Sequence, residues 1–240
     1  MKIRLDQALV VRKLVATRSQ AAVYVELGKV KVGGRVVTKP GYFVSEKTEV
    51  ELTQDEQFVS RAALKLKSVA EKLNLDFAGK TVLDVGSSTG GFTDFSLRRG
   101  AKKVVAVDVG TDQLHPKLRA NLRVELHEKT DIRDFRTTEI IDLVVIDVSF
   151  ISIREILPNI LKHLATDKTE IVAMVKPQFE TGEKVKNAGV VKNDTERRKI
   201  LRDFEVWARQ NMIIENKSDS EVAGTNGNRE RFYLLNMCQK

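Results

Sequence analysis

Four residues with acid–base side chains occupy equivalent places in the chain, each at or next to the end of a short apolar stretch. They are Asp84, Asp108, Asp147 and Lys176. The four stretches are 81–85, 103–107, 141–146 and 171–175. If these are parallel strands of one sheet, their carboxyl ends meet at one edge, which is where open α/β sheets bind ligands. The sequence therefore predicts a site in which three carboxylates and one amine lie close together.

The segment DVGSSTGGF, which includes the end of the first stretch, departs from the G-x-G-x-x-G spacing of dinucleotide-binding loops. Asp84 precedes its first glycine, so a pyrophosphate would be repelled, whereas a ligand with an ammonium group and a ribose would be attracted. Asp108 is placed to accept hydrogen bonds from ribose hydroxyls. These features favour S-adenosylmethionine over a nicotinamide dinucleotide; a turn that needs glycine only for its backbone is the alternative. The residues expected to contact the ligand are Asp84, Gly86, Ser87, Gly90, Gly91, Phe92, Asp108, Asp131 and Asp147.

Short apolar stretches alternate with amphipathic segments from about residue 78 onwards. This order predicts parallel strands joined by helical crossovers, and hence a doubly wound, Rossmann-like α/β sheet. The polar segment TQDEQF at 53–58 is a plausible hinge before it. We therefore expect a small α+β domain over 1–55 and a larger domain over 56–240.

The positive charge of the protein is concentrated in its first fifty residues. The chain has 240 residues, of which 41 are Lys or Arg and 33 are Asp or Glu, giving a formal net charge of +8. Residues 1–50 hold ten basic and four acidic side chains, a net +6 of that total. Such a field attracts polyanions, chiefly nucleic acids, through release of counterions. A basic surface that serves only solubility is the alternative.

The order of elements in this first segment predicts a small module. Apolar spacing indicates helices over 4–14 and from Thr17 or Ser19 to about Leu27. A period of two around the Gly33-Gly34 turn indicates a hairpin, and 50–52 a further strand. Two helices followed by a basic hairpin resemble the ribosomal-protein-S-four-type RNA-binding domain, which implies contact with folded RNA. The residues expected to contact RNA are Arg4, Arg12, Lys13, Arg18, Ser19, Gln20, Lys29, Lys31 and Arg35.

Motifs of the second segment resemble one family of methyltransferases. They read DVGSSTGGFTD, KKVVAVDVGTDQL, IDVSFIS, VKPQFETGEK and GNRERF. They are similar to the TlyA family, a branch of the FtsJ-like RNA 2′-O-methyltransferases that also carries the N-terminal module. The resemblance implies methyl transfer from S-adenosylmethionine to a ribose 2′-hydroxyl of ribosomal RNA, at a cytidine. It also implies a catalytic Lys-Asp-Lys-Glu tetrad, which matches Lys65, Asp147, Lys176 and Glu230.

One position departs from the family pattern. Arg231 follows Glu230, where the family usually has an aromatic residue, so a one-residue shift in the alignment of Glu230 stays open. A ribose hydroxyl is a weak nucleophile and needs a base to accept its proton. Our hypothesis assigns that role to the neutral amine of Lys176. Burial and nearby positive charges favour this neutral form and nearby carboxylates oppose it, so the sequence leaves the balance open.

Missing motifs narrow the chemistry further. Cys238 is the single cysteine and lies outside any motif, which disfavours carbon-5 methylation of pyrimidines through a cysteine nucleophile. The segment DVSF has no proline, unlike the loops of exocyclic-amine methyltransferases. The three histidines lack ligand spacing, so we expect no metal. With no apolar run long enough for a membrane span and no secretory signal in the sequence, we expect a cytosolic protein that binds no membrane.

Several alternatives stay open. Asp131, in the segment TDIR, is either a contact for the adenine amine or a cap of its own loop. The stretch 184–194 is either a lid over RNA or a surface loop. For the whole protein, the competing functions are an RNA-binding protein without activity, a cytolysin, as the hemolysin label of the family suggests, and a small-molecule methyltransferase.

Overall fold

The computed structural model describes residues 2–15, 17–53, 58–181, 189–191, 193–224 and 227–238. The chain divides into two compact units, Met1–Arg61 and Ala62–Lys240, which are treated separately below. Most of the predicted hinge and most of the stretch 184–194 lie outside the described residues. The domain boundary predicted at 55 and 56 stays a prediction for the same reason.

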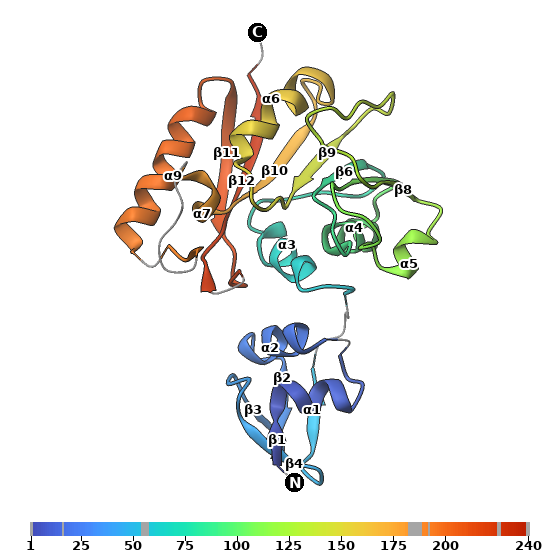
Figure 1. Ribbon diagram of the computed structural model, residues 1–240, viewed down its shortest axis with the longest axis vertical. Coiled ribbons are helices and arrows are strands. Elements are labelled where there is room, and N and C mark those ends of the chain that lie inside the picture. The colour runs from blue at the N-terminus through green and yellow to red at the C-terminus, as the bar shows by residue number, and fades with distance from the viewer. Residues whose placement is uncertain are drawn as a thin grey trace. The chain divides into compact units, whose positions relative to one another are not determined.

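The first unit is a small α+β module, as predicted. Its helices α1 and α2 pack against each other, beside the pair β1–β4 and the antiparallel sheet β3-β2-β5 (Figure 1). Thr17 caps α2 by accepting a hydrogen bond from the Gln20 amide. Gly33 and Gly34 have φ of +53° and +76°, which suits the tight turn of a β2–β3 hairpin. The elements are β1 (Lys2–Arg4), α1 (Leu5–Val11), α2 (Arg18–Glu26), β2 (Val30–Val32), β3 (Arg35–Val36), β4 (Phe43–Ser45) and β5 (Val50–Leu52).

Two features of this unit differ from the sequence prediction. Helix α1 ends at Val11 rather than at Leu14, because Lys13 takes a left-handed conformation with φ of +58°. The β1–β4 pair was not predicted, since each strand has only three residues and pairs with a distant segment. Local periodicity carries little signal for such short strands.

The second unit is built on a seven-stranded sheet in the order β11-β12-β10-β9-β6-β7-β8. The five strands from β10 to β8 in this order are parallel, and β12 runs antiparallel to both of its neighbours. The strands are β6 (Thr81–Val85), β7 (Lys103–Val107), β8 (Val124–His127), β9 (Leu143–Ile146), β10 (Glu170–Val175), β11 (Met212–Asp219) and β12 (Arg231–Met237).

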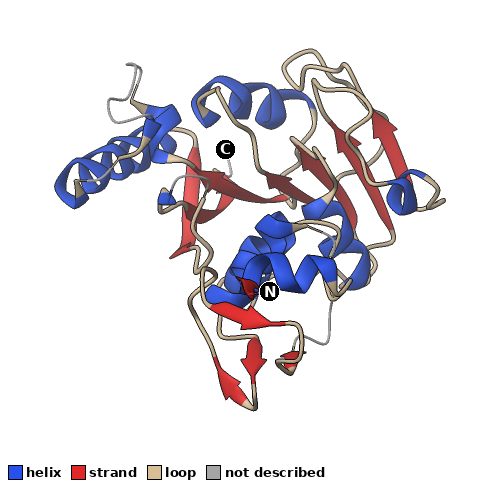
Figure 2. Cartoon of the chain, turned by 60° about the horizontal axis from the view of Figure 1, so that its bottom comes forward, coloured by secondary structure: helices blue, strands red, loops and turns tan. Residues whose placement is uncertain are grey.

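Helices cover both faces of this sheet (Figure 2). On one face, Leu157 of α6 and Phe204 of α9 belong to the same buried core as Val144 and Ile146 of β9. Helices α3 and α4 pack together, and α4 packs on β6 and β7. The helices are α3 (Ala62–Ala70), α4 (Gly91–Arg98), α5 (Pro116–Arg119), α6 (Ile153–His163), α7 (Pro177–Glu180) and α9 (Asp194–Ala208). The predicted doubly wound α/β fold is confirmed.

Candidate functional site

The register of the central strands brings the predicted acids to one edge of the sheet. Val85 of β6 lies opposite both Val107 of β7 and Ile146 of β9. The residues that follow these three are Gly86, Asp108 and Asp147. Because neighbouring strands are about 5 Å apart, these residues share the carboxyl edge of the sheet. The clustering predicted from the strand ends is therefore present.

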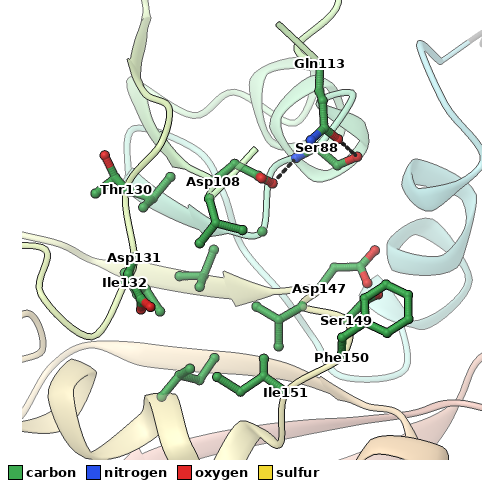
Figure 3. Close-up of a pocket in the computed structure, with 16 residues that line it drawn as sticks. Ser88, Asp108, Gln113, Thr130, Asp131, Ile132, Asp147, Ser149, Phe150 and Ile151 are labelled. Carbon is green, nitrogen blue, oxygen red and sulfur yellow. Dashed lines mark hydrogen bonds between the residues drawn. The ribbon is translucent and has the colours of Figure 1, made fainter. Parts of the chain in front are cut away.

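A cavity of about 380 Å³ opens at this edge. That volume lies within the usual range for small-molecule sites. Figure 3 shows Asp131 and Asp147 on opposite sides of the view, with Asp108 between them and the apolar side chains of Ile132 and Ile151 beside them. A concave, partly apolar site with a few convergent carboxylates suits a nucleoside ligand that carries positive charge.

Glycines of the loop after β6 leave room for this arrangement. Gly86 has φ of +81°, and a Cβ there would lie 2.7 Å from the backbone oxygen of Asp147. Gly90 has φ of +92°, and a Cβ there would collide with Leu118. Glycine is therefore required at both positions, for conformation and for space. The two residues after Gly90, which begin helix α4 and include Phe92, are buried.

Asp84 is fully buried, with one oxygen bound and the other not. Its Oδ2 accepts a hydrogen bond of 2.6 Å from the Thr93 hydroxyl, and its Oδ1 has no hydrogen-bond partner within the described part of the chain. Burial, reinforced by the negative charges of Asp147 and Asp108, raises the pKa of Asp84 to about 7. Asp84 lies behind the residues that line the cavity rather than among them. Direct contact between Asp84 and a bound amine stays a prediction.

Asp108 and Asp131 both line the cavity, but their carboxylates are engaged differently. Asp108 accepts a hydrogen bond of 2.7 Å from the backbone amide of Ser88 (Figure 3) and another of 2.7 Å from the backbone amide of Gly110. Asp131 accepts from the backbone and the guanidinium of Arg133, which lowers the pKa of Asp131. Asp131 therefore does cap its own loop and also faces the cavity, so both predicted roles remain compatible with its position.

Lys176 and Asp147 form an ion pair at the ends of β10 and β9. The Lys176 ammonium nitrogen lies 2.6 Å from Asp147 Oδ1, and both side chains are largely buried. Lys176 also donates a hydrogen bond of 2.8 Å to the Ser149 hydroxyl. Next to it, Phe150 is 91% exposed, takes φ of +66° and lines the cavity. The Lys176 amine is thus held beside the cavity by the Asp147 carboxylate and the Ser149 hydroxyl, which belong to the same loop.

Lys65 and Glu230 form a second, more deeply buried ion pair. Their charged atoms are 2.5 Å apart, and the two side chains are 7% and 3% exposed. Val175 pairs with Arg231 across β10 and β12, so Glu230 lies next to the strand end that carries Lys176. A Cβ on Gly224 would lie 2.5 Å from Glu230 Oε1, so glycine there makes room for this carboxylate.

Arg231 occupies a different environment from Glu230. Its guanidinium Nε lies 2.5 Å from Asp219, which also accepts from Arg197 of α9 at 2.8 Å. Arg197 donates a second hydrogen bond to the backbone oxygen of Arg229. The structure thus places Glu230, rather than its neighbour, beside Lys65. Arg231, where the family usually has an aromatic residue, instead forms an ion-pair cluster with Asp219 and Arg197.

The residues at the cavity fit S-adenosylmethionine. Two buried oxygens near the carboxyl end of β6, Asp84 Oδ1 and Ser87 Oγ, have no hydrogen-bond partner within the described residues. Such atoms are costly unless a ligand or water satisfies them. Three carboxylates line the cavity and suit a ligand with positive charge, and one of them, Asp108, suits ribose hydroxyls.

The described residues lack both a metal-binding cluster and a membrane-spanning helix. They contain no group of three or more His, Cys, Asp or Glu side chains that could hold a metal ion. None of their helices is long and apolar enough to cross a membrane.

The basic residues of the first unit fall into two groups. Arg12 donates hydrogen bonds to the backbone oxygens of Thr48 and Ser45, and Gln20 is buried and donates to the Phe58 oxygen. These two side chains hold the unit together. Arg4 and Arg18 both bind the buried carboxylate of Asp6 while remaining partly exposed. Lys31 is half-buried, and the exposed members of the predicted set are Lys13, Arg18, Ser19, Lys29 and Arg35.

Sequence reasoning missed three residues of the site. Thr93 binds Asp84, Ser149 binds Lys176, and Glu180 accepts hydrogen bonds from the loop that follows Asp147. Ser149 and Glu180 lie inside the motifs IDVSFIS and VKPQFETGEK, so their position was available as a signal. Their hydrogen-bond partners lie 27 residues away in the chain, and the motifs alone do not show that these segments come into contact.

The fold and the cavity define a methyltransferase of the Rossmann-like class, with an acid-lined site at the carboxyl edge of the sheet. Two family models match the chain: "FtsJ-like methyltransferase" over residues 58–237 and "S4 domain" over residues 3–50. The chain belongs to the FtsJ-like methyltransferase family and, within it, to the TlyA proteins.

Similar proteins support this placement. The 23S rRNA (cytidine-2′-O)-methyltransferase TlyA of Campylobacter jejuni is 44% identical over 74% of this chain and 70% of that protein. The 16S/23S rRNA (cytidine-2′-O)-methyltransferase TlyA of Mycobacterium tuberculosis is 41% identical over 82% of this chain and 75% of that protein. A solved structure named "Putative hemolysin from Streptococcus thermophilus" is 35% identical, with a TM-score of 0.74, covering 100% of this chain and 90% of that one.

Proposed function

We propose that this methyltransferase uses S-adenosylmethionine to methylate the ribose 2′-hydroxyl of a cytidine in ribosomal RNA. The observation that carries the proposal is the Lys176–Asp147 ion pair at the wall of an acid-lined cavity. The names of the TlyA relatives support the substrate class. With ribosomal RNA as its substrate, the protein would act in the cytoplasm, the location expected from the sequence.

Each side of the cavity has a part in holding the cofactor. Asp108 would accept hydrogen bonds from the ribose hydroxyls, and Asp131, which also lines the cavity, would accept one from the adenine amine. The loop from Gly86 to Phe92 would follow the ligand closely, since two of its glycines have no room for a side chain. When bound, S-adenosylmethionine supplies a methyl group on a positively charged sulfur.

Lys176 is the proposed base. Its amine is held between Asp147 and Ser149, so its position is set before substrate arrives, which is what proton transfer requires. Only a neutral amine can accept the 2′-hydroxyl proton, so Lys176 first gives up to solvent the proton that its ion pair with Asp147 favours. It then takes the hydroxyl proton as the oxygen becomes a nucleophile. The Lys65–Glu230 pair lies next to this strand end, and its buried charges would orient the ribose and the amine.

The first unit is the proposed RNA-binding unit. Its exposed basic residues Lys13, Lys29 and Arg35 are available for phosphates, with Ser19 as a neutral donor. Arg4 and Arg18 are paired with Asp6 but remain partly exposed, so each could also reach a phosphate. Lys31 is half-buried and lies 3.8 Å from Glu51, a contact that RNA phosphate could replace. We leave Arg12 and Gln20 out of this set because both side chains are engaged within the unit.

The test is methyl transfer from labelled S-adenosylmethionine to ribosomal subunits from cells that lack the gene. A ribose 2′-O-methyl group protects the adjacent phosphodiester from alkaline cleavage, so the modified nucleotide is identified by a gap in the hydrolysis ladder. Lys176→Ala should abolish transfer and leave cofactor binding within a few-fold. Lys80→Ala is the matched control, because Lys80 forms an ion pair of 2.6 Å with Glu170 at the other end of β10. Tight RNA binding without transfer would instead support an RNA-binding protein without activity.

A further inference from the structure

The turn that carries Lys176 contacts the loop after Asp147 at three successive places. Lys176, Phe179 and Glu180 lie on one face of the turn, at positions i, i+3 and i+4. Lys176 binds the Ser149 hydroxyl, and the ring of Phe179 lies 5.2 Å from that of Phe150. Glu180 forms the third contact, farthest from the ion pair. The turn that carries the Lys176 amine and the loop after Asp147 are thus held together by these three contacts.

Glu180 makes the most buried of these contacts. Its side chain is 1% exposed. One carboxylate oxygen accepts a hydrogen bond of 2.6 Å from the Ser152 hydroxyl, and the other accepts one of 2.8 Å from the Ile153 amide. Arg154 lies 3.4 Å from it and balances its charge. Burial raises the pKa of Glu180, so the folded protein bears a cost to keep a carboxylate at this position.

The loop that Glu180 holds is short and strained. Its first residue, Asp147, is fixed to the sheet by a hydrogen bond from its amide to the Val85 oxygen. Its last residues, Ser152 and Ile153, are fixed by Glu180. Between these two ends, Phe150 has φ of +66°, a left-handed conformation that is unfavourable for a bulky residue. Such a conformation persists only where the surroundings hold it, and Glu180 provides one of the two anchors.

We infer that Glu180 is a positioning residue for the methyl transfer proposed above: it holds the loop 148–152 so that Ser149 and Asp147 keep the Lys176 amine aligned. This inference rests on the proposed function, since it assigns a role within the same site. Glu180 does not line the cavity, so it acts through the loop and not by contact with the cofactor.

The experiment compares three variants with the wild-type protein in single-turnover methyl transfer, cofactor binding and thermal unfolding. Glu180→Ala removes both hydrogen bonds and should lower the rate of transfer about 10- to 100-fold, with cofactor affinity changed only a few-fold. Glu180→Gln retains an acceptor for the Ile153 amide and should recover most of the rate. Asn193→Ala is the matched control, because Asn193 caps α9 by accepting from the Thr195 and Glu196 amides. It should lose stability but keep its rate.

A second measurement does not depend on activity. Hydrogen exchange should show the Ile153 amide protected in the wild type and in Glu180→Gln, and exposed in Glu180→Ala. If Glu180→Ala is too unstable to study, Ser152→Ala removes one of the two bonds and should give an intermediate loss of rate. A wild-type protein without transfer activity would refute the proposed function. An active wild type with an unimpaired Glu180→Ala, or an equal loss in Asn193→Ala, would refute the positioning role alone.

Discussion

Replacing the buried acid Asp84 by asparagine should stabilise the ligand-free protein and weaken cofactor binding. Asp84 is fully buried, and its environment raises its pKa to about 7 from an ordinary value of 3.8. Asparagine has nearly the same shape and carries no charge. Its side-chain oxygen can still accept the hydrogen bond from Thr93. The change therefore tests the cost of this charge with little change in packing.

The magnitude follows from the difference in pKa between the folded and unfolded states. Between pH 4 and about pH 7 the unfolded state loses the Asp84 proton and the folded state keeps it, so the free energy of unfolding falls as pH rises. The slope is about 1.4 kcal/mol per pH unit, which makes the full cost about 4 kcal/mol above pH 7. Any constant effect of asparagine cancels when two pH values are compared. The advantage of Asp84→Asn should therefore grow by about 3 kcal/mol between pH 5 and pH 8.

Urea unfolding of both proteins at pH 5 and pH 8 measures this difference directly. Calorimetry of S-adenosylmethionine binding supplies the second measurement. Below pH 7 the free wild-type protein holds a proton on Asp84, and a positively charged ligand favours the carboxylate. Binding at pH 6 should therefore release up to one proton, detected by repeating the titration in buffers of different ionisation enthalpy. The asparagine variant should release none from this position and bind about tenfold more weakly.

A stability difference between the two proteins that is equal at pH 5 and pH 8, or that shifts in favour of the wild type as pH rises, would refute the account of Asp84 as an uncompensated buried acid. If Asp84→Asn shows the expected change in stability but binds the cofactor as tightly as the wild type, the carboxylate is still costly to bury. Such a result would show instead that the charge of Asp84 does not serve the ligand.

Four further substitutions test the site and the first unit. Gly224→Ala should lower turnover at least about tenfold, because its Cβ would displace the Glu230 carboxylate, while calorimetry shows cofactor affinity unchanged. Gly86→Ala should weaken cofactor binding in the same assay, because φ is +81° and the Cβ would collide with the Asp147 backbone. Arg12→Ala should lower the melting temperature of the protein, because it removes hydrogen bonds to the Thr48 and Ser45 oxygens. Lys13→Ala, next to it and exposed, should leave the melting temperature unchanged and reduce the salt dependence of RNA binding by about one ion.

The central strands were predictable because their signal is local. The stretches 81–85, 103–107 and 171–175 each combine apolar and β-branched residues, and the structure has strands there. The C-terminal strands β11 and β12 were not predicted. Strand β11 lies at the edge of the sheet, and most of its residues are exposed or half-buried, so its sequence MIIENKSD lacks a regular alternation. Strand β11 forms because it pairs with β12, which in turn pairs with β10, and sequence periodicity does not report such pairing.

The site was predictable to a different extent in its two halves. Asp108, Asp147 and Lys176 could be placed together from the residues alone, because parallel strands bring their ends to one edge. Lys65 lies on a helix and Glu230 precedes an antiparallel strand, so spacing gave no reason to join them. Their ion pair came into view through the family resemblance and is seen directly in the structure.

Charge counts also cannot tell which basic residues are free to bind RNA. Arg12 and Lys13 are adjacent and equally basic in the sequence. In the structure, the Arg12 guanidinium satisfies backbone oxygens of the turn after β4, whereas Lys13 is exposed. The left-handed conformation of Lys13 ends α1 at this point. Composition thus predicted a nucleic-acid partner for the first unit. The fold determines which of its basic side chains remain free to contact that partner.

The buried charges of the site differ in how they are compensated. Lys65 is balanced by Glu230, Lys176 by Asp147, and Glu180 by Arg154 and two hydrogen bonds. Asp84 is stabilised by hydrogen bonding from Thr93, but burial and the negative charges of Asp147 and Asp108 outweigh this and raise its pKa. A buried group whose compensation is missing in the free protein gains most from a ligand of opposite charge. Asp84 is therefore where the binding of a cationic cofactor would couple most strongly to the stability of the fold.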